Sequence, residues 1–203
     1  PEGVFSLLHG RGRQVGNALV KHPATKAVGF TGSLAGGRAL FDLASARPEP
    51  IPVYAEMGSL NPVFVLPGAL AERGDAIAEG LLGSVTLGVG QFCTNPGLVL
   101  GIDGDDLTQF VNKSSDLFNE AMPATMLNAG ICDAYQSGLQ TLLGTEGVNV
   151  AGKSQTDADA NKTEAAPHVF TTDVKTFMGQ PDLSHEVFGP STLVVNCGSK
   201  ADL

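Results

Sequence analysis

Two side chains in this sequence could together carry out nucleophilic chemistry. They are the thiol of Cys93 and the carboxylate of Glu56, which precedes it by 37 residues. A cysteine thiolate attacks carbonyl carbons readily and leaves a thioester that water can hydrolyse. A partly buried glutamate can serve as the base for that water. The pair therefore predicts a reaction that passes through a covalent sulfur intermediate.

The sequence around Cys93 favours a reactive thiol over a structural one. Taken alone, a cysteine is more often a small buried core residue. Cys93 lies instead in a loop-like stretch, Gly90-Gln91-Phe92-Cys93 followed by Thr94-Asn95-Pro96, and not in an apolar helix or strand. Cys132 falls on a predicted amphipathic helix and Cys197 ends a predicted strand, so we expect both to be inert.

A second candidate site is Phe30-Thr31-Gly32-Ser33, where a predicted strand ends and a helix begins. Open parallel sheets bind ligands at the carboxyl ends of their strands, and a helix N-terminus offers free N–H groups to an anion. Ser33 can cap that helix or donate its hydroxyl to a phosphate. For an isolated Thr-Gly-Ser, the simple cap is the more common outcome.

The first third of the chain alternates strand-like and helix-like segments. Strands are expected at 3–8, 27–30 and 51–56, with helices at 14–21 and 34–46 between them. This β-α-β-α-β order predicts a parallel, doubly wound sheet.

The rest of the chain follows a similar scheme beyond a composition change near 57–62, where we expect a domain boundary. Buried strands are predicted at 61–65 and 191–196, a further strand at 99–102, and short strands at 148–150 and 168–171. Helices are predicted at 76–89, 107–120 and 126–143, and an exposed loop at 152–166.

Composition excludes several classes of protein. The 203 residues are 42% hydrophobic and 16% charged, which is typical of a folded globular chain. A net charge of −9 and few aromatic side chains argue against a nucleic-acid partner, and no apolar run approaches the ~18 residues of a membrane span. An odd count of three cysteines favours the reducing cytoplasm. The four histidines show no metal-ligand spacing.

Four segments in order resemble the NAD(P)-dependent aldehyde dehydrogenase superfamily over essentially the whole chain. They are Phe30-Thr31-Gly32-Ser33, Glu56-Met57-Gly58, Gly90-Gln91-Phe92-Cys93 and Glu186-Val187-Phe188-Gly189-Pro190. The resemblance implies an α/β fold of open, mostly parallel sheets with helices on both faces, truncated at both ends. Residues 1–57 would then be the C-terminal part of the cofactor-binding domain, and 58–203 a catalytic domain incomplete at its C-terminal end.

The resemblance also implies roles for the residues of the catalytic centre. Cys93 would form a thiohemiacetal with an aldehyde, give up a hydride to the nicotinamide of NADP or NAD, and become a thioester. Glu56 would activate the hydrolytic water. The backbone N–H of Cys93 would help to stabilise the oxyanion.

The resemblance also implies which residues would hold the cofactor. Gly32 and Ser33 would meet a phosphate, Glu186 the nicotinamide ribose, and Phe188 the ring. The loop from Gly10 to Gly16 would lie near the adenosine. Its glycine spacing is one residue too wide for a dinucleotide fingerprint, but Arg11 or, preferably, Arg13 would contact a 2′-phosphate there. A solvated arginine at a helix start is an equally good interpretation of Arg13.

The surrounding sequences most resemble the branch that oxidises 2,5-dioxopentanoate (α-ketoglutarate semialdehyde), and imply a small-molecule aldehyde substrate and a homo-oligomeric parent. Ser59 departs from the family's second glycine after the glutamate, which is tolerable at a negative φ. We expect this chain alone to fold but to show little or no activity. The alternatives are a coenzyme A-acylating aldehyde dehydrogenase, a non-catalytic interaction module, and a cysteine hydrolase, which would need a histidine beside Cys93.

Overall fold

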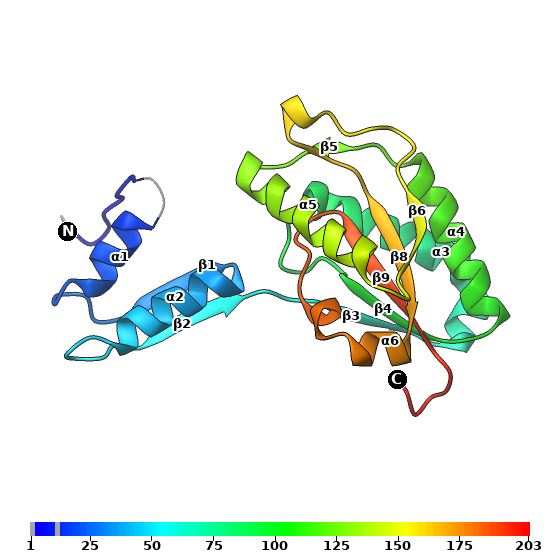
Figure 1. Cartoon of the computed structure of the whole chain (residues 1–203), viewed down its shortest axis with the longest axis horizontal. Coiled ribbons are helices and arrows are strands. Elements are labelled where there is room, and N and C mark those ends of the chain that lie inside the picture. The colour runs from blue at the N-terminus through cyan, green and yellow to red at the C-terminus, as the bar shows by residue number, and fades with distance from the viewer. Residues whose placement is uncertain (1–2, 11–12) are drawn as a thin grey trace. The chain divides into compact units, whose positions relative to one another are not determined.

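The computed structural model describes residues 3–10 and 13–203, which form two compact units, Pro1–Gly58 and Ser59–Leu203. The division falls one residue after the expected boundary. The positions of the two units relative to one another are not determined, so each is described by itself (Figure 1).

Unit 1 is a short α/β unit. Its elements are α1 (Gln14–Lys21), β1 (Val28–Gly32), α2 (Leu34–Ser45) and β2 (Val53–Met57). β1 and β2 pair in parallel, with Thr31 opposite Glu56, as the alternating order predicts. Gly37 allows α2 to approach the side chain of Met57, because a Cβ at this glycine would collide with the sulfur.

The strand expected at 3–8 is wrong. Within the described part of the chain, residues 3–10 are irregular and exposed, and no strand pairs with them. A strand requires a partner for its backbone N–H and C=O groups, and the apolar pattern of Val4, Phe5, Leu7 and Leu8 does not provide one. The sheet of unit 1 therefore has two strands in the described residues, not three.

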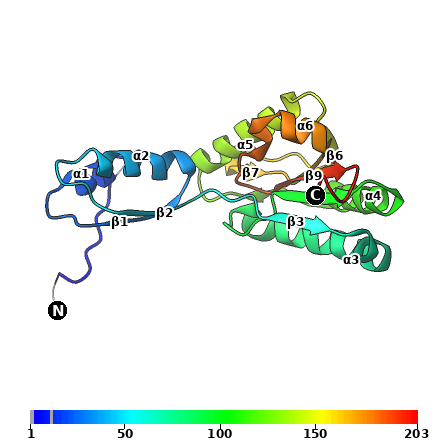
Figure 2. The same cartoon turned by 90° about the horizontal axis from the view of Figure 1, so that it is seen from below.

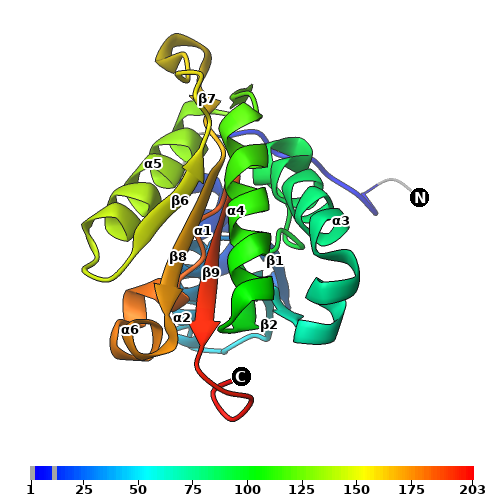
Figure 3. The same cartoon turned by 90° about the vertical axis from the view of Figure 1, so that its right-hand side faces the viewer.

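Unit 2 is built on a five-stranded mixed sheet. The strands are β3 (Pro62–Val65), β4 (Leu98–Ile102), β9 (Ser191–Cys197), β8 (His168–Asp173) and β6 (Asn149–Lys153), in that spatial order. The first four run parallel and β6 is antiparallel to β8. Figure 3 shows β9, β8 and β6 side by side. β3 is an edge strand with only Val65 buried, which corrects the buried strand expected at 61–65.

Helices cover both faces of this sheet, as Figure 2 shows for α5 (Ala129–Gly144) and α6 (Val174–Gly179) on one face and α3 (Pro67–Thr86) on the other. α4 (Asp105–Glu120) packs with α3. Alternate residues of β9 serve the two cores: Leu193 and Val195 belong to the core under α5, and Val194 to the core under α3 and α4. The two-residue period of a strand produces this division.

Smaller elements connect these layers. They are the 3₁₀ turns η1 (Leu87–Gly90), η2 (Ala160–Lys162) and η3 (Pro181–Ser184), and the antiparallel pair β5 (Ala124–Thr125) and β7 (Glu164–Ala165). The exposed loop expected at 152–166 is therefore partly ordered, and Ala165 is fully buried because β7 pairs with β5. Among the described residues, no helix has the length and apolar character needed to cross a membrane.

Candidate active site

Cys93 lies in an exposed turn that follows an unusual piece of backbone. Gly88, Val89 and Gly90 all have positive φ, at 54°, 59° and 67°, a conformation that glycine adopts at little cost but valine does not. The Gln91 side chain supports the turn from both ends of its amide: its Nε2 donates to the Gly88 carbonyl at 2.9 Å, and its Oε1 accepts from the backbone of Leu127 at 2.9 Å.

The segment that begins unit 2 holds the same turn from another side. Asn61 Nδ2 donates to the carbonyl of Cys93 at 2.7 Å and to the carbonyl of Asn95 at 2.9 Å. Ser59 Oγ donates to Asn61 Oδ1 at 2.7 Å. Ser59 is absent from the residues with positive φ, so the condition under which serine can replace the family's glycine is met.

The segment from Glu186 to Pro190 lies against the Cys93 turn. Asn95 Nδ2 donates to the Gly189 carbonyl at 3.2 Å, and a Cβ at Gly90 would collide with the backbone of Gly189 and Pro190. The ring of Tyr135 in α5 also packs on Gly189, and its hydroxyl donates to the Ala166 carbonyl at 2.8 Å. Two of the predicted site segments are thus brought together within unit 2.

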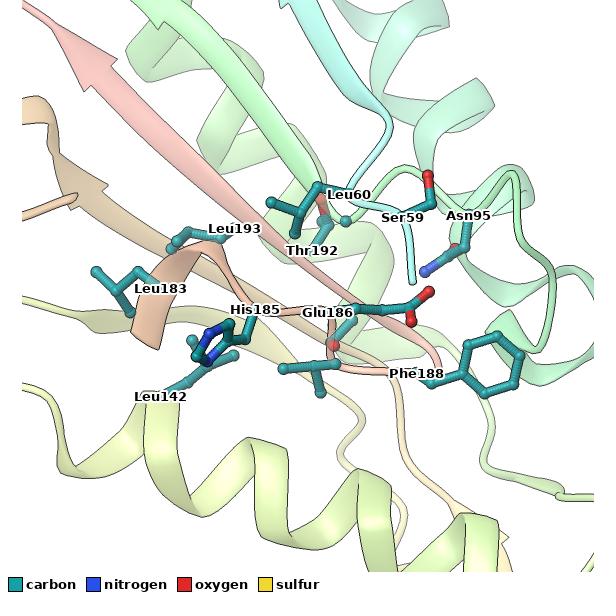
Figure 4. A pocket seen from close by; sticks show the side chains of 13 residues that line it. Ser59, Leu60, Asn95, Leu142, Leu183, His185, Glu186, Phe188, Thr192 and Leu193 are labelled. Carbon is teal, nitrogen blue, oxygen red and sulfur yellow. The ribbon is translucent and has the colours of Figure 1, made fainter. Parts of the chain in front are cut away.

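Glu186 and Phe188 are half-buried and line a pocket with Ser59, Leu60 and Asn95, shown in Figure 4. Burial raises the pKa of the Glu186 carboxyl, and the backbone N–H of Ser59 opposes the shift. The Asn95 Oδ1 atom is buried without a hydrogen-bond partner. The pocket therefore combines apolar walls with a few polar groups, and its volume of about 20 Å³ admits about one water molecule.

In unit 1, Ser33 is the N-cap of α2. Its Oγ accepts from the backbone N–H of Gly36 at 3.2 Å, which leaves the hydroxyl proton free to be donated. Gly32 ends β1 beneath the Phe30 ring, which a Cβ at this position would strike. The strand end and the helix start thus expose the N–H groups that an anion requires.

Glu56 lies on β2 and is exposed, so the partial burial on which its role as a base depends is not present within unit 1. Arg13 is exposed at the N-cap of α1. Arg11 lies outside the described residues. The structure brings Cys93, Glu186 and Phe188 into one unit, but it does not position Glu56, Gly32, Ser33 or Arg13 relative to them.

The other two cysteines are shielded. Cys132 and Cys197 are buried, and Cys93 is exposed. Burial raises the pKa of the Cys197 thiol, and the nearby Asp202 carboxylate raises it further. Within 3–10 and 13–203, no three or more His, Cys, Asp or Glu side chains gather in a way that could hold a metal ion.

Sequence reasoning missed the residues that hold the Cys93 turn. Asn61 and Asn95 make its hydrogen bonds, and each directly precedes a proline. Asn-Pro is a turn signal, and asparagine tolerates the left-handed region that Asn61 occupies at φ 47°. That pair of dipeptides could have identified the turns, although not the contact between them.

The sequence pattern of the aldehyde dehydrogenase family matches residues 1–203, so the chain belongs to this family. It is 52% identical over 197 residues to alpha-ketoglutaric semialdehyde dehydrogenase 2 of Azospirillum brasilense, covering 97% of this chain and 37% of that protein. It is 44% identical over 204 residues to alpha-ketoglutaric semialdehyde dehydrogenase of Acinetobacter baylyi, covering 100% of this chain and 38% of that protein. The chain thus spans well under half of either relative.

Solved structures share the fold. A NAD-dependent benzaldehyde dehydrogenase from Corynebacterium glutamicum superposes with a TM-score of 0.75 at 23% identity, covering 95% of this chain and 41% of that one. Proline utilization A from Bdellovibrio bacteriovorus gives a TM-score of 0.76 at 19% identity, covering 94% of this chain and 20% of that one. The expected α/β, aldehyde dehydrogenase-like fold is confirmed.

Proposed function

We propose that the protein containing this chain oxidises an aldehyde to a carboxylic acid with NADP or NAD. The observation that carries the proposal is an exposed thiol, Cys93, on a turn held by side-chain hydrogen bonds and lying against the half-buried Glu186 segment. Family membership supports the same class of reaction.

In the proposed reaction, the Cys93 thiolate adds to the aldehyde carbon and forms a thiohemiacetal. Loss of hydride from that carbon leaves the acyl group on sulfur as a thioester. Glu56 then removes a proton from water as the water attacks the thioester, which releases the acid and frees the thiol. The Cys93 backbone N–H stabilises the oxyanion.

The proposed cofactor residues fit a nicotinamide dinucleotide. The capped N-terminus of α2, with Gly32 and the free hydroxyl proton of Ser33, suits a phosphate. Glu186 offers a carboxylate to ribose hydroxyls, Phe188 an apolar contact to the ring, and Arg13 a cation to a 2′-phosphate. The cofactor supplies the hydride acceptor when it is bound.

We propose α-ketoglutarate semialdehyde as the substrate, because both relatives above carry that name at 52% and 44% identity. Residues 1–57 are assigned to the cofactor domain and 58–203 to the catalytic domain. Three free cysteines support a cytoplasmic location. We also propose that the whole protein is a homo-oligomer.

The test follows NAD(P)H formation at 340 nm with α-ketoglutarate semialdehyde, using the complete protein and its Cys93→Ser variant. We expect turnover to fall by about four orders of magnitude or more in the variant, because the covalent route is lost. Cys132→Ser is the matched control and should keep its rate. Equal rates in Cys93→Ser and the parent would refute the mechanism.

Product analysis distinguishes the proposed reaction from its principal alternative. A coenzyme A-acylating enzyme would release an acyl-coenzyme A and would not need Glu56. We expect free acid whether or not coenzyme A is present. Acyl-coenzyme A as the main product, with Glu56→Gln still active, would favour that alternative.

A further inference from the structure

The amide of Asn61 is fully engaged with the turn that carries Cys93. Its nitrogen has two N–H donors, and both are used, one on the Cys93 carbonyl at 2.7 Å and one on the Asn95 carbonyl at 2.9 Å. These two carbonyls stand at the two ends of the three-residue stretch 93–95. One side chain therefore holds both ends of the turn.

The orientation of that amide is itself determined. Ser59 Oγ donates to Asn61 Oδ1 at 2.7 Å, so the oxygen faces the serine and the nitrogen faces the turn. Ser59 stands where the resembled family has a glycine, which has no hydroxyl to offer. Asn61 also adopts φ 47°, a left-handed conformation that asparagine tolerates.

We propose that Asn61 is a positioning residue for Cys93 and that Ser59 orients its amide, a proposal that rests on the function proposed above. The backbone of Cys93 sets the direction of its Cα–Cβ bond and of its N–H group. The first aims the thiol, and the second faces the developing oxyanion. Reactions of this kind lose roughly 10²-fold when the reacting group moves by about 1 Å.

The same short segment also reaches the cofactor side of the pocket. The Ser59 backbone N–H contacts the carboxylate of Glu186, while the Ser59 hydroxyl is directed to Asn61. The stretch 59–61 therefore links two proposed roles, the nucleophile and the ribose contact. A change confined to the Asn61 amide should affect the first and spare the second.

The variants are chosen to separate the amide from the backbone. Asn61→Gly removes both donors and accepts a positive φ without strain. Asn61→Asp keeps the shape and the Ser59 bond, but it places a carboxylate against two carbonyl oxygens. Asn112→Asp, on the exposed face of α4, makes the same chemical change away from the site.

Two measurements are made. In the complete protein, we expect kcat for the semialdehyde to fall about 10- to 100-fold in Asn61→Gly and further in Asn61→Asp, with the KM for cofactor within twofold. Ser59→Ala should give a smaller loss, and Asn112→Asp none. In this chain, hydrogen–deuterium exchange should quicken for peptides covering 88–97 and stay unchanged in α4 and β9.

Three outcomes would decide against the proposal. An unchanged kcat in Asn61→Gly would overturn it, as would faster exchange throughout unit 2, which would mark a general structural role. An increase in the KM for cofactor as large as the loss in kcat would overturn it too. If the parent shows no aldehyde-dependent turnover while 88–97 still loosens in Asn61→Gly, the proposed function fails and the hold on the turn remains supported.

Discussion

At the scale of single residues, the carboxyl of Glu186 is partly buried, which disfavours its ionised form. Burial raises the pKa of its carboxyl, so the folded state holds the proton more readily than the unfolded state. Above that raised pKa the ionised carboxylate therefore opposes folding. A buried carboxyl that lowers the stability of the fold when it ionises is a candidate for a functional residue.

Glu186→Gln tests this cost of ionisation. The amide oxygen can still accept from the Ser59 N–H, and the buried charge is gone. At pH 7 we expect the free energy of unfolding, measured with urea, to be equal to or higher than that of the parent. Cofactor affinity, measured by NADPH fluorescence, should fall about tenfold or more, as for a lost hydrogen bond to a charged group. Lower stability with unchanged binding would contradict both expectations.

His168 predicts a pH dependence of stability. Burial lowers its pKa, the Ala166 carbonyl opposes the shift, and the Lys153 charge adds to it. Nδ1 lies 2.9 Å from the Ala166 carbonyl and so donates to it, and the ring stacks on Phe170. The unfolded chain binds the proton more readily than the fold does. Stability from this residue is therefore present above the ordinary pKa of 6.5 and is lost as the pH falls below it.

We expect the thermal midpoint to fall between pH 7.5 and pH 5 and to fall less in His168→Gln, which keeps a donor for Ala166. His9→Gln, at an exposed position, is the control and should follow the parent. If both variants follow the parent curve, another group is responsible for the slope.

The exposure of Cys93 was predictable from residue types, because a cysteine among glycine, asparagine and proline is unsuited to a core. What surrounds it was not predictable. Asn61 reaches the turn across 32 residues of chain, and Asn95 of the turn reaches Gly189 across 94. Hydrogen bonds at such separations depend on the packing of β3 beside β4 and of β4 beside β9. The expected burial of Glu56 is not met within unit 1 because its strand face is open.

At the scale of elements, the two glycines at positions 90 and 83 should behave in opposite ways. Gly90 has φ 67°, and a Cβ there would strike Gly189 and Pro190. Gly90→Ala should cost about 2–5 kcal/mol of unfolding free energy, from backbone strain and overpacking together. Gly83 lies exposed within α3 with nothing near its Cβ position, so Gly83→Ala should add about 0.5–1 kcal/mol.

Urea unfolding measures both changes. Both variants add one methyl group, so the difference between them measures the strain at the positive φ of Gly90 together with the contact between the Cys93 turn and the segment 186–190. A cost for Gly90→Ala no greater than 0.5 kcal/mol, roughly the scatter of surface substitutions, would show that the two segments can separate freely.

The elements themselves were predicted where apolar periodicity was strong. β4, β8 and β9 appear near their expected positions because their alternate residues fill two cores. The helix expected at 76–89 corresponds to the second part of α3, which begins earlier, at Pro67, a residue favoured in the first turn, and is kinked at the non-helical residue Arg73. It ends before 87 because Gly88 and Val89 leave the helical region. The apolar residues after position 86 made the predicted helix too long. Residue type alone does not show that the backbone leaves the helical region at Gly88 and Val89.

At the scale of the whole molecule, the two units differ in what they bury. Unit 2 has a core on each face of a five-stranded sheet. Unit 1 has a two-stranded sheet, and Val20 and Ala44 are its buried hydrophobic residues among those described. Two-stranded sheets are marginally stable on their own. Much of the cooperative stability of the chain should therefore reside in residues 59–203.

We expect residues 59–203, produced alone, to unfold cooperatively with a thermal midpoint within about 5 °C of the whole chain, roughly the effect of 1 kcal/mol. Residues 1–58 alone should show no cooperative transition. Calorimetry of the two separate pieces and of the whole chain makes the comparison. A midpoint lowered by 15 °C or more in 59–203 would mean that unit 1 contributes substantially to the fold.

The division between the units was visible as a change in composition near 57–62, because turn-forming residues gather there. How the units sit together could not be inferred, since surface apolar residues such as Phe5 and Tyr54, 83% and 72% exposed, carry no information on what covers them.

The unequal exposure of the three thiols has a consequence for handling the protein. Among the three thiols, peroxide or air would reach the one at Cys93 and convert it to a sulfenic acid or to a disulfide between two chains. Cys132 and Cys197 would stay reduced inside the fold. Ageing in storage would then oxidise Cys93 first among the thiols, dithiothreitol would reverse the sulfenic acid and the disulfide, and the mass of the peptide that contains Cys93 would report the fraction of chains whose exposed thiol is intact.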